Sequence, residues 1–276
     1  VHGIGSPHVT RSHFDAQDYM ETAIPGDKGA TSGWLNRATG LLGHEGTPFQ
    51  AVSMTSAMPR ALYGKEYALS IENLANLKVG DGDAKKLVNQ GFESLYRQTT
   101  QEMINNAGNV SLDAMKILEE ARVNAIKPQA GVQYPRTDLG IALKQIAQLI
   151  KGGVGLEIAF AESAGWDTHA RQSAQFGGFT RQARDLSACI SAFWNDIEKY
   201  QDDVVLMTMT EFGRTIHQNG SMGTDHGRAS CMFVLGNEVK GGKVYGEVPE
   251  LAVENLEDGR DLPVTTDFRS LFSNVT

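Results

Sequence analysis

The order of elements in the second half of the chain predicts an α/β fold with a doubly wound, mostly parallel sheet. Helical spacing alternates there with short apolar runs, and the runs at 156–160 and 204–209 are almost continuously apolar. Such strands are typical of a parallel sheet with helices on both faces. Polar residues follow both runs directly, at the strand ends where open α/β sheets bind ligands.

The composition narrows the class of protein. The chain has 276 residues, which suits one large α/β domain or two small ones. Its net charge of −8 and the lack of a lysine/arginine run argue against nucleic acid as a partner. No apolar stretch approaches the roughly 18 residues that cross a bilayer. Cys189 and Cys231 predict two buried free thiols, with a disulfide left open.

Residues 1–21 are rich in Gly, Ser, His and Asp, and we expect a loop that leads into a short helix. Two interpretations of Ser12 stay open. In the first, Ser12 is a nucleophile assisted by His13 or Arg11. In the second, Ser12 is only the N-cap of the helix.

The middle of the chain predicts scaffold. Residues 33–42 predict a short amphipathic helix, 49–54 an apolar strand and 67–71 a weaker strand. At about 81–125 we expect a helical insertion without histidine. It is either a cap that shapes substrate access or a structural addition.

Two long helices precede the apolar strands. Thr137 opens the first, which Gly152 and Gly153 end. The second is the clearest in the sequence, because its apolar residues follow a 4-3-4-3-4 spacing and form one stripe. That stripe consists of Phe179, Ala183, Leu186, Ile190, Phe193 and Ile197.

The candidate site lies in three motifs within residues 165–227, namely GWDTH, TEFGR and GTDHG. Their nitrogen and oxygen side chains suit a divalent cation, and we expect Zn²⁺, with Mn²⁺, Ca²⁺ or Mg²⁺ as alternatives. The predicted ligands are Asp167, His169, Glu211, Asp225 and His226.

The sequence spacing within each Asp/His pair predicts how these residues would share cations. In extended backbone, Asp167 and His169 project to the same side, whereas the adjacent Asp225 and His226 project differently and can serve two neighbouring cations. Three arginines are predicted to bind an anionic substrate: Arg11, Arg214 and Arg228. An ordinary turn stays the alternative, since Asp and His beside Gly are common in turns.

Seven motifs in order closely resemble the bacterial DUF1501 family, which is grouped with the alkaline phosphatase/sulfatase superfamily. They are TRSHFDAQ, YPRTDLG, GWDTH, TEFGRT, NGS.GTDHGRA, VLG..VKGG..YG and TTDFR. The resemblance covers nearly all the chain except Asp81 to Asn124. It implies one alkaline-phosphatase-like α/β domain over residues 1–276, with a mostly parallel sheet and the helical insertion.

The resemblance also implies a metal-dependent hydrolase of phosphate or sulfate esters, acting on a small-molecule or glycan anionic ester. Ser12 resembles the nucleophile position. Asp225 and His226 resemble the superfamily's Asp-His metal pair, and Asp167 with His169 its other pair. As an alternative, Glu211 occupies the position where the superfamily has a strand followed by the Asp of an Asp-His metal pair.

Members of the family usually begin with a twin-arginine export signal and a strand that ends in a GG.DG-like motif. Neither occurs here, and the chain opens on Val1. We therefore expect a fragment of a periplasmic or exported bacterial protein.

Two further hypotheses stay open. The chain could be a non-catalytic exported binding protein that keeps the fold and binds a cation or an anionic glycan. The metal could instead be purely structural. A dinucleotide-dependent enzyme is disfavoured, because no G-x-G-x-x-G follows a predicted strand.

Overall fold

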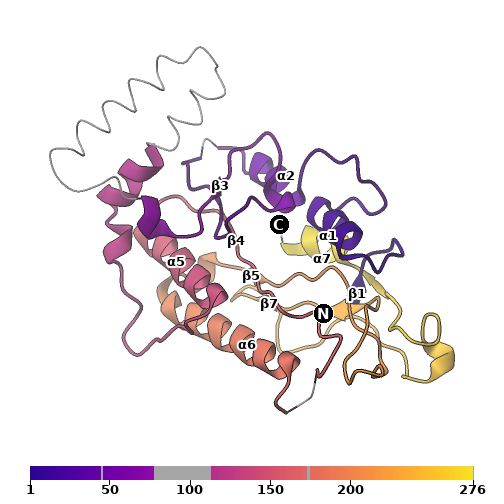
Figure 1. The fold of residues 1–276 in the computed structure, drawn as a ribbon. Helices are drawn as coiled ribbons and strands as arrows, with labels where there is room; N and C mark the ends of the chain where they lie inside the picture. The colour runs from indigo at the N-terminus through magenta and orange to yellow at the C-terminus, as the bar shows by residue number, and fades with distance from the viewer. Residues whose placement is uncertain (45, 78–112, 173–174, 276) are drawn as a thin grey trace.

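The computed structural model describes residues 1–44, 46–77, 113–172 and 175–275 (Figure 1). Its helices are α1 (His13–Thr22), α2 (Trp34–Leu41), α5 (Asp138–Gly152), α6 (Gly178–Asp196) and α7 (Phe268–Val275). Its strands are β1 (His2–Gly5), β2 (Ala51–Ser53), β3 (Leu69–Ser70), β4 (Ile158–Phe160), β5 (Leu206–Met207), β6 (Ser230–Cys231), β7 (Val234–Leu235) and β8 (Thr266–Asp267). Short 3₁₀ turns include η1 (Arg60–Leu62) and η3 (Val123–Ala125).

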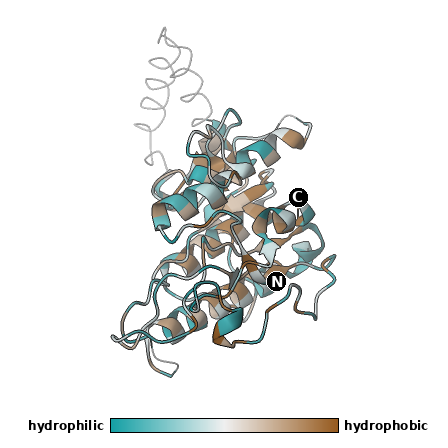
Figure 2. Cartoon of the chain, turned by 90° about the vertical axis from the view of Figure 1, so that its right-hand side faces the viewer, coloured by the Kyte–Doolittle hydropathy of each residue, from teal (hydrophilic) through white to brown (hydrophobic). Residues whose placement is uncertain are grey.

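The predicted long helices are confirmed as α5 and α6, which lie side by side (Figure 1). Thr137 caps α5, since its side-chain oxygen accepts a hydrogen bond from the amide of Gly140 at 3.3 Å. Gly153 ends the helix with a φ of 62°, a left-handed conformation that suits glycine. Hydrophobic and hydrophilic residues alternate along the helices (Figure 2), as expected when one face is buried.

Two hydrophobic cores lie on opposite faces of the strands. The first contains the apolar faces of α5 and α6, and the second contains residues of α1, α2 and α7. Strand β5 contributes to both, because successive strand side chains point to opposite faces. Its Leu206 packs on the first core and its Met207 on the second. Helices therefore cover both faces, as predicted.

The mixed α/β class is confirmed, but the described strands do not form the single mostly parallel sheet that we expected. They form three short sheets, with strand orders β6-β1-β8, β3-β2-β4 and β5-β7. β2 pairs in parallel with β3 and β4, whereas β5 and β7 are antiparallel. A continuous apolar run shows that a strand is buried, but it does not show the direction of its partner.

The apolar run Cys231 to Leu235, which also predicts a single buried strand, is divided as well. β6 pairs with β1 and β7 pairs with β5, so the run CMFVL belongs to two sheets. Both cysteines are free, as predicted. The burial of Cys189 is confirmed, whereas the prediction that Cys231 is buried was wrong. The next residue, Met232, takes the inward position, and the alternation of extended backbone turns Cys231 outward.

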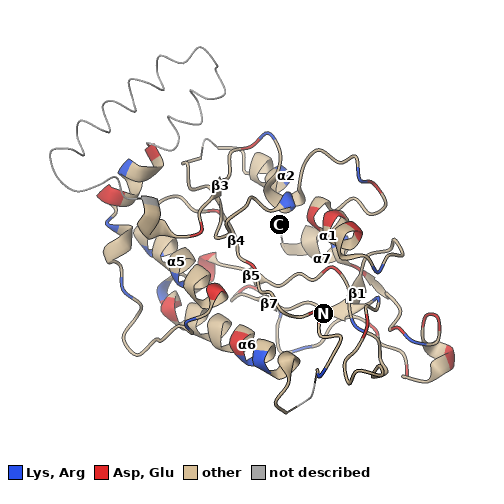
Figure 3. Cartoon of the chain, in the orientation of Figure 1, with Lys and Arg blue, Asp and Glu red and all other residues tan. Residues whose placement is uncertain are grey.

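Most of the predicted helical insertion, residues 81–112, lies outside the described residues. Residues 113–120 are helical, and η3 follows them. Among the described residues, no helix combines the length and apolar character needed to cross a membrane. Acidic and basic residues are interspersed along α5 and α6 (Figure 3), so these helices do not form a basic face for nucleic acid.

Candidate metal centre

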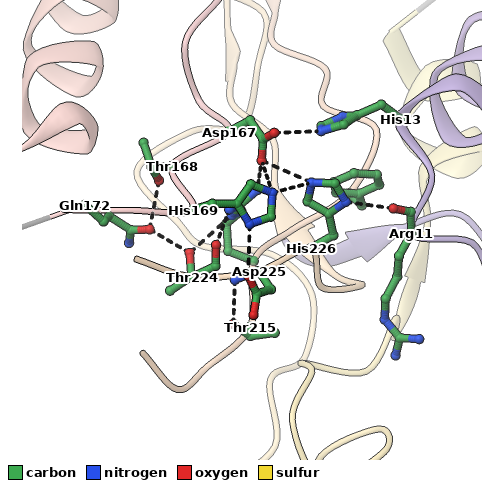
Figure 4. Close-up of polar contacts among 12 residues, drawn as sticks. Arg11, His13, Asp167, Thr168, His169, Gln172, Thr215, Thr224, Asp225 and His226 are labelled. Atoms are coloured by element: carbon green, nitrogen blue, oxygen red, sulfur yellow. Dashed lines mark hydrogen bonds and ion pairs between the residues drawn. The ribbon is translucent and has the colours of Figure 1, made fainter. Parts of the chain in front are cut away.

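The structure brings six predicted site residues together from four separated segments. His13 is the first residue of α1. The loop after β4 contains Asp167 and His169, the loop after β5 contains Glu211, and the loop before β6 contains Asp225 and His226. Hydrogen bonds and ion pairs connect their side chains (Figure 4). The six are His13, Asp167, His169, Glu211, Asp225 and His226.

Glycines let the loops of the site approach each other closely. A side chain at Gly223 would collide with the backbone of His169, and one at Gly227 with the backbone of Arg214. Gly213 likewise has no room for a Cβ, because the carbonyl of Ala229 stands there. These three glycines of the predicted motifs are therefore explained by close backbone contact.

Asp167 is the centre of the cluster. Its Oδ1 lies 2.9 Å from Nε2 of His169 and 3.1 Å from Nε2 of His226. Its Oδ2 lies 3.3 Å from Nε2 of His13. The guanidinium of Arg214 also contacts Oδ1. Three imidazoles thus turn the same ring atom toward one carboxylate (Figure 4).

The other ring nitrogen of each histidine faces a hydrogen-bond acceptor. Nδ1 of His169 lies 2.9 Å from Oδ1 of Asp225, and Nδ1 of His13 lies 2.6 Å from Oε1 of Glu211. Nδ1 of His226 lies 2.7 Å from the backbone oxygen of Arg11. When a cation takes the lone pair on Nε2, these acceptors hold the proton of each neutral ring on Nδ1. Histidines that bind metals are held in this way.

The convergence of lone pairs fits a cation. Nε2 of His169 lies 2.9 Å from Nε2 of His226, so these two atoms and Oδ1 of Asp167 form a triangle with sides of 2.9–3.1 Å. Ligands about 2.1 Å from one metal, at angles of roughly 90–109°, lie about 3.0–3.4 Å apart. A second combination contains His13, Asp167 and His226, with donor atoms within 4.8 Å of one another.

The carboxylate of Asp167 is ionised at neutral pH. Burial alone raises its pKa, but hydrogen bonds from Arg214, His13 and His226 outweigh that effect, and the pKa falls to about 2. The pKa of Asp225 is also lowered, first by its hydrogen bond with His169 and then by that with Asn219. Both charges are therefore present when the site meets a cation.

Each of the three predicted substrate-binding arginines is engaged by the protein. Arg11 donates to Asp258 and Asp261. Arg214 pairs with Asp167, and its Nε donates to Oγ1 of Thr224 at 3.2 Å. Their role in substrate binding stays a prediction.

Arg228 is buried, with 7% of its surface exposed. Its Nη1 donates to the backbone oxygen of His8 at 3.0 Å, and its Nε lies 3.1 Å from Oε1 of Glu257. These contacts tie the loop before β6 to the N-terminal segment. In this conformation Arg228 serves packing.

Ser12 occupies the N-cap position of α1, but its side chain makes no capping hydrogen bond. Its neighbours on both sides contact the cluster, because Arg11 accepts from His226 and His13 reaches Asp167. The capping interpretation is thus confirmed for the position and not for the interaction. A nucleophilic role stays a prediction.

Sequence reasoning missed Asn219. Its Nδ2 donates to the backbone oxygen of His169 and to Oδ1 of Asp225, both at 2.9 Å. Its Oδ1 accepts from the amides of Ser221 and Gly223. Asparagine before glycine is typical of turns. That signal was present in NGS, but it does not identify the partners.

The cluster lies outside the cavity along α2. That cavity measures about 1000 Å³, and its lining includes Asn36, Arg37, Leu62, Tyr63 and Glu66. No cluster residue lines it. Side chains in the cluster are partly exposed, at 44% for both Asp167 and His169. The cluster is therefore accessible to solvent without a path through that cavity.

Comparison with known proteins gives one match. The model of a family described as "Protein of unknown function (DUF1501)" matches residues 2–276. No curated protein and no solved structure matches the chain. Because the match spans almost the whole sequence, this chain belongs to the DUF1501 family.

Proposed function

We propose that the chain is a metal-dependent hydrolase of phosphate or sulfate esters with Ser12 as its nucleophile. The main support is the convergence of three imidazole Nε2 atoms on the ionised carboxylate of Asp167. A divalent cation bound there would supply positive charge that lowers the pKa of a hydroxyl group and stabilises a departing oxygen. The resemblance to the alkaline phosphatase/sulfatase superfamily supports the same chemistry and an exported, periplasmic location.

The contacts support a division of labour among the predicted residues. We assign the binding of the cation to His13, Asp167, His169 and His226. Two carboxylates orient these rings, since Glu211 contacts Nδ1 of His13 and Asp225 contacts Nδ1 of His169. A site with several imidazoles favours Zn²⁺ over Ca²⁺ and Mg²⁺, which prefer oxygen ligands.

In the proposed reaction, Oγ of Ser12 attacks the phosphorus or sulfur atom and the ester oxygen leaves. Water then cleaves the serine ester and restores the hydroxyl group. Ser12 is suited to this role because its hydroxyl makes no capping bond and its sequence neighbours, Arg11 and His13, both contact the cluster.

The first test combines metal analysis with ester hydrolysis. The purified chain, loaded with Zn²⁺, should contain about one or two equivalents of metal and hydrolyse aryl phosphates or sulfates. Asp167→Asn should lose both properties. Ser12→Ala should lose hydrolysis and keep the metal. Asp203→Asn, an exposed carboxylate after α6, is the control and should behave like the wild type.

A wild-type chain that takes up no metal after loading with Zn²⁺ or Mn²⁺ would contradict the proposal. Metal binding without turnover would favour the second candidate, an exported protein that binds a cation or an anionic glycan. One observation supports the cation-binding form of that candidate. Arg11, Arg214 and Arg228 all donate to protein acceptors, which argues against the binding of any anion by these three residues.

A further inference from the structure

A buried carboxylate, Asp261, is linked to the cluster although no predicted motif contains it. Its side chain is fully buried. Nε of Arg11 donates to its Oδ2 at 2.7 Å, and Nη2 of Arg11 contacts the same oxygen. Nε of Arg260 donates to its Oδ1 at 3.2 Å. A buried charge is tolerated when it is paired and hydrogen-bonded, so the two arginines and Asp261 form one unit.

Both arginines also hold His226. The backbone oxygen of Arg11 faces Nδ1 of His226 at 2.7 Å (Figure 4). Nη2 of Arg260 donates to the backbone oxygen of His226 at 3.1 Å. One buried carboxylate is therefore connected to the ring of His226 and to its backbone.

The backbone near Asp261 is fixed to the loop that contains His226. Asp261 and Glu257 form an isolated β-bridge with N–O distances of 2.9 and 3.0 Å. The amide of Ile216 donates to the oxygen of Arg260, and the amide of Ala229 to the oxygen of Leu262, both at 3.0 Å. These bonds attach the segment around Asp261 to residues that lie before and after His226 in the sequence.

We infer that Asp261 is a positioning residue that, through Arg11 and Arg260, holds the ring of His226 with Nδ1 at the backbone oxygen of Arg11 and Nε2 toward Asp167. The carboxylate holds the side chain of Arg11, and the backbone oxygen of Arg11 is thereby kept at Nδ1. The inference rests on the proposed function, because the orientation of the ring matters when Nε2 binds a cation.

The direct test observes the ring of His226 without metal. The full chain, stripped of metal with a chelator and labelled with ¹⁵N-histidine, gives ring signals that depend on the hydrogen bond of each nitrogen. His226 is assigned by comparison with His226→Gln. We expect the Nδ1 signal of His226 to shift in Asp261→Asn, because Arg11 no longer holds its backbone oxygen at that atom.

Asp258→Asn is the matched control. Asp258 also accepts from Arg11, but its side chain is 64% exposed, so its loss leaves the buried pair intact. The control should keep the wild-type ring signals of His226. If Asp261→Asn does not fold, Arg260→Gln decides, because Arg260 is 44% exposed and contacts both Asp261 and His226.

The second readout is Zn²⁺ affinity, measured by competition with a chromophoric chelator. Loss of a group that orients a ligand typically weakens binding about 10–100-fold, and we expect that loss in Asp261→Asn. Unchanged ring signals of His226 in the folded variant would overturn the inference. A wild type that binds no Zn²⁺ would refute the proposed function alone, since the ring signals are measured without metal.

Discussion

Two aspartates in different regions of the molecule show how a structural carboxylate differs from a proposed metal ligand. Asp196 ends α6 in the helical layer, and only 1% of its side chain is exposed. It accepts from the amide of Gln129 at 2.6 Å, from Nζ of Lys151 at 2.7 Å and from the hydroxyl of Tyr134 at 2.9 Å. All three partners are donors, so the charge is fully compensated.

Asp167 lies in a loop, with 44% of its side chain exposed. It has one permanent cationic partner, Arg214, and its other neighbours are imidazole nitrogens, each of which can donate a proton or offer a lone pair. The amide and the ammonium group that hold Asp196 can only donate. The comparison teaches that a ligand site is recognised by side chains that can present lone pairs to one point.

The largest expected effect comes from removing the carboxylate of Asp196, whose charge is compensated by three donors. Asp196→Ala leaves the ammonium group of Lys151, which is 14% exposed, without its carboxylate. Loss of one partner of a buried pair costs about 3–5 kcal/mol, and we expect this decrease in the free energy of unfolding. Urea denaturation measures it. Asp203→Ala, at an exposed position, should change stability by less than about 0.5 kcal/mol.

The next effect, on Zn²⁺ affinity, distinguishes a proposed metal ligand from the residue proposed to orient it. We expect His169→Gln to weaken Zn²⁺ binding about 100-fold, which corresponds to about 2.7 kcal/mol. Asp225→Asn, which changes the partner of Nδ1 of His169, should weaken binding about tenfold. Titration against a chelator measures both. Equal losses in the two variants would instead support the prediction that Asp225 binds the metal itself.

A smaller effect depends on pH. The pKa of Asp167 is lowered from 3.8 to about 2, so its contribution to the stability of the metal-free protein is present above about pH 4 and is lost as the pH falls toward 2. Because the side chain is 44% exposed and solvent screens its partners, we expect about 1 kcal/mol or less. Urea midpoints of the wild type and Asp167→Asn should converge over this range. A constant difference would refute the prediction.

The smallest effect compares two helix caps. The side chain of Thr137 caps α5, whereas that of Ser12 makes no cap bond at α1. Thr137→Ala should lower the melting temperature and cost about 1 kcal/mol. Ser12→Ala should leave stability nearly unchanged and remove hydrolysis. A destabilised Ser12→Ala would show that the serine is a structural cap after all.

The sequence predicted the helical layer well, because α5 and α6 have strong local signals. Thr137, Gly153 and the apolar stripe of α6 determine where those helices begin, end and pack. The sheets were predicted less well. Strand pairing depends on distant segments, and the apolar runs at β5 and β7 do not encode that the two strands are antiparallel.

The motifs predicted that Asp167, His169 and His226 lie together, because each follows or precedes a strand. They did not predict that Glu211 and Asp225 would face the Nδ1 atoms of histidines. Nor did they predict that Arg228 would be buried or that Asp261 would be connected to His226. Which ring atom faces which acceptor depends on the path of several loops, and a single sequence does not contain that path locally.

The three tightly packed glycines of the site have a consequence for recognising related sequences. The path of the loops depends on Gly213, Gly223 and Gly227, whereas the chemistry of the site depends on the histidines. A homologue that retains the glycines but has lost imidazoles would keep the shape of the site without its cluster of side chains. A homologue that replaces the glycines would need a different loop path. The spacing of these glycines is therefore a fingerprint of the architecture that can be searched independently of activity.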